Sequence, residues 1–138
     1  MRTLTMNLGL WLQIAAAVQL AIAVLNLFLV RIFNWKEDLD RVPLLIREVF
    51  HVHAWFISVT LAIFAVITWR FAAQMTTNPA CRWLAAGIGC FWALRTVLQV
   101  TYYSSTHWRG LPGRTAIHGA LLVVYGGFTF LYLLTASA

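Results

Sequence analysis

Polar and ionisable side chains recur at helical spacing inside four long apolar runs of this sequence. Glu48 and His51 are three residues apart, Arg95 and Gln99 are four apart, and Tyr102 follows after another three. Residues three, four and seven apart lie on one face of an α-helix. Inside a bilayer such side chains are costly, face the interior of a helix bundle and mark candidate functional sites. The candidate ligand-binding residues are Asn26, Glu48, Arg95, Gln99 and Tyr102.

Two histidines are the candidate cofactor ligands. His51 lies in the second apolar run and His118 in the fourth. Neutral imidazole is a common ligand of haem iron, so this pair could clamp a haem b between two helices, with Arg47, Arg95 or Arg114 near its propionates. The alternative is that the two histidines only hydrogen-bond across helices. No spacing typical of a zinc site is present, so no further metal is expected.

Four helices must position these residues. The apolar runs cover residues 8–32, 44–72, 82–103 and 115–134. Each is close to or above the roughly 20 residues that cross a bilayer as a helix, and backbone groups in lipid must be satisfied within the segment. Short connectors favour antiparallel neighbours. The sequence therefore predicts an all-α fold, a polytopic membrane protein forming one up-down-up-down bundle over residues 1–138.

The composition supports the same class of protein. Hydrophobic residues make up 62% of the 138, charged residues only 10%, and the mean hydropathy is +0.79. A soluble domain carries about 25% charged residues. The net charge is +6, but the basic residues stand mostly at the ends of the apolar runs, where phospholipid headgroups lie. The lipid bilayer is the expected partner, and nucleic acid is not.

Depth and charge suggest where the candidate residues gather. In an up-down bundle Asn26, Glu48 with His51, the last part of the third run and His118 all lie toward the same membrane surface. The excess of Lys and Arg on the first and third connectors places these connectors in the cytoplasm and both termini outside. A Glu48–Arg95 ion pair that only fixes helix register is the structural alternative to a ligand site.

Small residues add a possible interface. Gly89 in the third run, and Gly119, Gly126 and Gly127 in the fourth, suit close helix crossings. Such crossings serve packing within the chain, a homo-oligomer or a complex with other membrane subunits.

Two resemblances bear on the function. Glu48-x-x-His51 on the second run, with His118 on the fourth, resembles one four-helix half of the haem A synthases, which implies that both histidines bind haem. The length of the chain, with Arg95 followed seven residues later by Tyr102, is similar to the MAPEG family of small membrane enzymes. That resemblance implies a lipophilic substrate.

Three functions therefore stay open. The first is binding of a cofactor or amphiphilic ligand in a polar pocket of one leaflet, with haem b and membrane electron transfer as the named candidate. The second is a non-catalytic subunit or scaffold whose polar cluster only organises helix packing. The third is a small membrane enzyme.

Overall fold

The protein is helical throughout the part of the chain that its structure describes. A computed structural model describes residues 2–102, 110 and 112–138, and the side chains in these ranges from residue 7 onward. The helices are α1 (Arg2–Leu27), α2 (Leu29–Ile32), α3 (Lys36–Asp40), α4 (Leu44–Thr77), α5 (Pro79–Thr101) and α6 (Pro112–Ser137). Tyr103, His107 and most of the third connector lie outside the described residues.

Four of these helices are long and apolar enough to cross a membrane. The candidate spans are Asn7–Leu27, Leu44–Thr77, Pro79–Thr101 and Pro112–Ser137. They correspond to the four apolar runs of the sequence. The first expected run covers both α1 and α2, because the backbone leaves helical geometry at Phe28, with φ −102° and ψ 1°. A second irregularity lies in α4 at Phe71, with φ −113° and ψ 16°.

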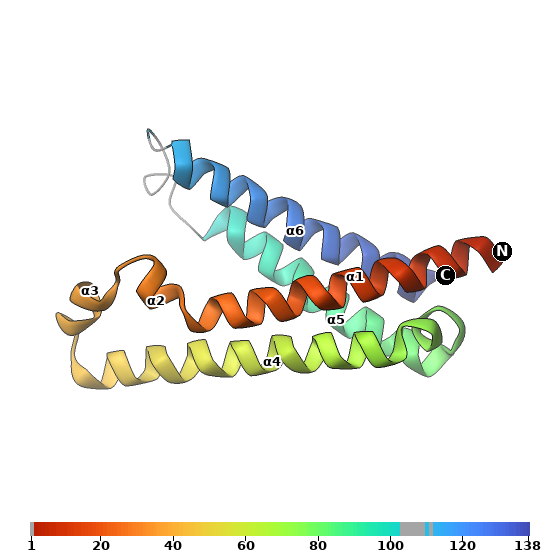
Figure 1. Cartoon of the computed structure of the whole chain (residues 1–138), viewed down its shortest axis with the longest axis horizontal. Helices are drawn as coiled ribbons and strands as arrows, with labels where there is room; N and C mark the ends of the chain where they lie inside the picture. The colour runs from red at the N-terminus through yellow and green to blue at the C-terminus, as the bar shows by residue number, and fades with distance from the viewer. Residues whose placement is uncertain (1, 103–109, 111) are drawn as a thin grey trace. The chain divides into compact units, whose positions relative to one another are not determined.

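The chain forms two compact units. One consists of Gln13–Arg70, and the other of Met1–Leu12 together with Phe71–Ala138. The first unit holds most of α1 and α4, and the second holds α5 and α6. Their elements can be followed by colour in Figure 1.

Within the second unit, α5 and α6 pack as an antiparallel hairpin (Figure 1). Asn78 caps the start of α5 by accepting a hydrogen bond from the Ala80 amide at 2.9 Å, and Pro79 occupies the first helical turn, where its missing N–H costs nothing. Near the end of α5, Gln99 meets His118 near the start of α6. The contact between Gln99 and His118 helps to fix the register of the hairpin.

Gly89 allows the closest approach in this hairpin. A Cβ built at Gly89 would lie 2.9 Å from Leu133 Cδ2 and 3.2 Å from Tyr132 Cβ. A Cβ at Gly119, Gly126 or Gly127 meets nothing within 4 Å. Of the four glycines expected to suit close crossings, Gly89 therefore makes one within the hairpin, and the three of the fourth run have open space beside them.

Within the first unit, α4 runs back alongside α1 after the short helices α2 and α3 (Figure 1). Asn26 joins the two long helices through its side chain. Arg47 donates a hydrogen bond to Asp40 at 2.8 Å, which ties the first turn of α4 to the end of α3. The first connector thus contains a short helix that an ion pair joins to α4.

Candidate functional site

The candidate site in the hairpin centres on Gln99 and His118. Gln99 Nε2 and His118 Nδ1 lie 2.9 Å apart. Gln99 stands in the last turn of an apolar helix and is only 5% exposed. A buried amide next to an imidazole is a strong hydrogen-bonding group in surroundings of low polarity. Two of the residues singled out in the sequence are therefore in direct contact.

One end of this amide has no partner. Gln99 Oε1 is buried, and no described group hydrogen-bonds to it. The other such atom in the described part of the chain is Nε of Arg82 at the opposite end of α5, but the Nη2 of the same guanidinium donates to the Thr76 carbonyl at 3.1 Å. Buried polar groups in proteins are nearly always satisfied, so an exception calls for a missing water, ion or ligand group.

Arg95 lies one helical turn before Gln99 on the same face of α5. Its guanidinium carbon lies 4.9 Å from the ring centroid of Tyr125 on α6, a distance typical of a cation–π contact. Tyr125 and His118 are seven residues apart and share one face of α6. The hairpin thus presents two adjacent polar layers, Gln99 with His118 and Arg95 with Tyr125.

An aromatic layer lies next to these polar layers, on the side toward the start of α5. Trp92 is 2% exposed and stacks on Tyr125 with ring centroids 5.2 Å apart, and its ring lies 4.6 Å from that of Phe128. Neither Trp92 nor Phe128 is among the candidate site residues of the sequence. The signal that could have placed Trp92 beside the site is its position seven residues before Gln99, on the same face of α5.

In the first unit, Asn26 acts as a clamp between helices. Its Nδ2 donates to the Ala54 carbonyl at 2.9 Å and to Ser58 Oγ at 2.8 Å, and Ser58 Oγ donates to the same carbonyl at 2.9 Å. Hydrogen bonds of this kind join membrane helices. The side-chain NH₂ of Asn26 is therefore used within the unit, which favours a structural role for this residue.

Glu48 and His51 are exposed on the first turns of α4. The His51 ring lies edge-on to Phe50 at 5.8 Å, and Phe50 lies edge-on to Trp35 at 6.5 Å. His53, two residues on, is within hydrogen-bonding distance of the Val49 carbonyl through Nδ1 at 2.8 Å. The His51 ring thus contacts an aromatic neighbour, and the role of His51 as a cofactor ligand stays a prediction.

Tyr102 stands at the end of α5 with 81% of its surface exposed, and its amide donates to the Leu98 carbonyl at 3.0 Å. It shares the face of Arg95 and Gln99 by spacing alone. The ligand-binding role predicted for Tyr102 is not tested by this geometry.

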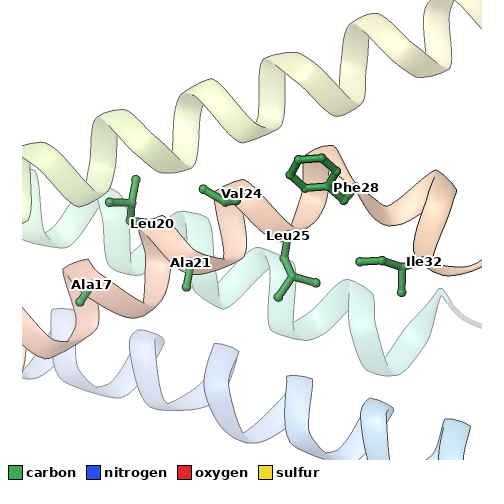
Figure 2. Close-up of a pocket in the computed structure, with 7 residues that line it drawn as sticks. All are labelled: Ala17, Leu20, Ala21, Val24, Leu25, Phe28 and Ile32. Carbon is green, nitrogen blue, oxygen red and sulfur yellow. The ribbon is translucent and has the colours of Figure 1, made fainter.

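Two open hollows in the described part of the chain are mainly apolar. One, of about 540 Å³, runs along α1 and α2 and is lined only by apolar side chains (Figure 2). The other, of about 590 Å³, lies on the α5–α6 hairpin and includes Thr96 and Thr129, whose hydroxyl oxygens are 3.4 Å apart. Neither is lined by any of the predicted site residues. The polar chemistry therefore lies at the Gln99–His118 layer and not in these hollows.

The contacts of His118 fit one requirement of a haem ligand. Histidines that bind metals use one ring nitrogen for the metal and donate the other N–H to a fixed acceptor. If the Gln99 amide is turned so that Oε1 accepts from Nδ1–H, Nε2 is the atom that would bind iron. Among the described residues no group of three or more His, Cys, Asp or Glu side chains is placed to hold a metal ion.

Comparison with known proteins finds no relative of this chain: no family model, curated protein or solved structure matches it.

Proposed function

We propose that the chain is a polytopic membrane protein, an up-down-up-down bundle of four spans, that binds an amphiphilic ligand or cofactor at the polar layers of the α5–α6 hairpin. Four helices of sufficient length and apolarity support the membrane assignment. The antiparallel hairpin supports the up-down order of the last two spans. The excess of basic residues on connectors one and three favours a cytoplasmic position for these connectors, with both termini outside.

The half-satisfied amide of Gln99 is the observation that carries this proposal. Leaving a buried acceptor without a partner costs about 1–3 kcal/mol. A chain that needed only to join α5 to α6 would not require a second polar end on this side chain, because α5 and α6 also pack through Gly89 and Trp92. A polar group from a ligand would remove the cost at Gln99 Oε1.

Haem b is the named candidate cofactor. His118 would bind the iron through Nε2, with the Gln99 amide turned so that its Oε1 accepts a hydrogen bond from Nδ1–H. His51 is the proposed second ligand, and Asn26, Glu48, Arg95 and Tyr102 complete the proposed site. A bound haem would supply one-electron transfer.

A scaffold is the second candidate function. The contacts that favour it are internal: Asn26 is bonded to Ala54 and Ser58 on the helix beside it. Arg95 likewise has an internal contact, a cation–π interaction with Tyr125 within the hairpin. In a subunit that only organises packing, all polar residues of the spans would be satisfied like Asn26, with ordered water on Gln99. A small membrane enzyme of the MAPEG kind is the third possibility, and it would require turnover of a lipophilic substrate.

The visible absorption spectrum of the protein, purified in mild detergent, tests the cofactor directly. A Soret band with reduced b-type peaks would identify haem, and His51→Ala and His118→Ala should then each abolish it while His53→Ala leaves it unchanged. A colourless protein that retains an amphiphile through purification would support ligand binding without haem. A colourless protein that retains nothing would overturn the proposal in favour of the scaffold.

A further inference from the structure

We infer that the ligand group that meets Gln99 is a ring oxygen of a lipophilic quinone, bound in both its quinone and its quinol form. This inference rests on the proposed function and names the class of ligand. Its basis is the pairing of a buried amide with an imidazole, Gln99 with His118, which can present two opposite hydrogen-bonding ends.

The first state of the pair presents an acceptor. If His118 carries its proton on Nε2, its Nδ1 is an acceptor and receives a hydrogen bond from Gln99 Nε2 across the observed 2.9 Å. Gln99 Oε1 then points away from the imidazole and needs a donor. The hydroxyl of a quinol is such a donor.

The second state presents a donor. If the proton moves to Nδ1, a half-turn of the amide places Oε1 on the imidazole and leaves the NH₂ group in the position that Oε1 had. The two orientations of an amide have nearly the same shape, so the surrounding packing accepts both. The carbonyl of a quinone accepts from this NH₂ group.

A carboxylate or phosphate headgroup accepts hydrogen bonds and would use the donor state alone. An alcohol can donate or accept, so it could pair with either state, but its oxygen does not change between the two forms. A quinone oxygen changes between C=O and C–OH, and the pair complements both without a change in protein charge.

The experiment titrates the purified full chain, in detergent micelles, with a benzoquinone that carries a ten-carbon alkyl chain. Quenching of tryptophan fluorescence reports binding of the oxidised form. The quinol is prepared with dithionite, which supplies two electrons while water supplies two protons, and its affinity is measured by competition with the quinone. We expect the dissociation constants of the two forms to lie within about tenfold of each other.

Variants locate the binding at Gln99. Gln99→Leu and the unbranched Gln99→Met should each weaken both forms by about tenfold, which corresponds to the loss of one hydrogen bond of about 1.4 kcal/mol. Gln74→Leu, which changes an exposed glutamine near the end of α4, is the matched control and should leave both constants unchanged. Circular dichroism confirms that the variants keep their helices.

Three results would overturn the inference. They are binding of only one form, equal binding by the wild type and Gln99→Met, and absence of binding of either form. If the quinone fails but the wild type retains another amphiphile that Gln99→Leu loses, the ligand class is wrong and the proposed function stands. If the wild type retains no amphiphile at all, both are wrong.

Discussion

Replacing Gly89 by alanine should weaken the α5–α6 hairpin, while the same change at Gly87 should not. A Cβ at Gly89 would lie 2.9 Å from Leu133 Cδ2, 3.1 Å from Leu133 Cγ and 3.2 Å from Tyr132 Cβ. Leu133 can turn its terminal atoms away. Tyr132 cannot move easily, because its side chain is fully buried and its Cβ is fixed to the backbone of α6.

The magnitude follows from two opposing terms. Alanine is favoured over glycine in a helix by about 0.8–1.0 kcal/mol. Overpacking a tight contact costs about 1–3 kcal/mol. At Gly87 a Cβ meets nothing within 4 Å, so only the first term acts and Gly87→Ala should be neutral or stabilising. Gly89→Ala should therefore be less stable than Gly87→Ala by about 1–3 kcal/mol, and Gly89→Val should be less stable still.

The assay is equilibrium unfolding in mixed micelles, in which the mole fraction of a denaturing detergent is raised and helix content is followed by circular dichroism. Both alanine variants lie on the same helix, two residues apart, so changes in helix propensity cancel in the comparison. Equal stability of Gly89→Ala and Gly87→Ala would refute the close crossing, and with it the register that brings Gln99 to His118.

Three further predictions concern other parts of the chain. Trp92→Ala should destabilise the protein by about 3–5 kcal/mol, because it removes a buried aromatic side chain. Trp83→Ala, at a side chain 80% exposed, should change the free energy of unfolding by less than about 0.5 kcal/mol. Similar losses of stability in the two variants would contradict the aromatic layer. Asn26→Leu should cost about 1 kcal/mol in the same unfolding assay, and a neutral result would show that the interhelical clamp contributes nothing. A cysteine at Asp38 should react with a membrane-impermeant reagent only from the cytoplasmic side and one at Ser137 only from outside, so labelling of both from one side would show that the charge bias misplaces the chain.

The helices themselves follow from composition and could be predicted from the sequence. Uninterrupted apolar runs with few charges leave no alternative to helices that satisfy their own backbone. The helix periodicity also placed Gln99 on the same face as Arg95, and the structure shows both turned toward α6. Both predictions depend only on hydrogen bonds within one helix or on the periodicity of the helix.

Contacts between helices could not be predicted in the same way. Nothing in the spacing of Asn26 shows that Ala54 and Ser58 will satisfy its NH₂ group, because this depends on the register of α4 against α1. The choice of Gly89 over Gly126 for the close crossing likewise depends on which face of each helix meets the other. The breaks at Phe28 and Phe71 occur without proline or glycine at those positions, so no local signal marks them.

Native mass spectrometry of the protein, released from mild detergent, tests the central claim most directly, since it reports whether the Gln99–His118 layer holds a ligand. The proposal predicts a bound species of defined mass on the wild type and on Gln74→Leu, and its loss from Gln99→Leu. A wild-type spectrum that shows only the bare chain, or a bound mass that Gln99→Leu retains in full, would contradict the claim.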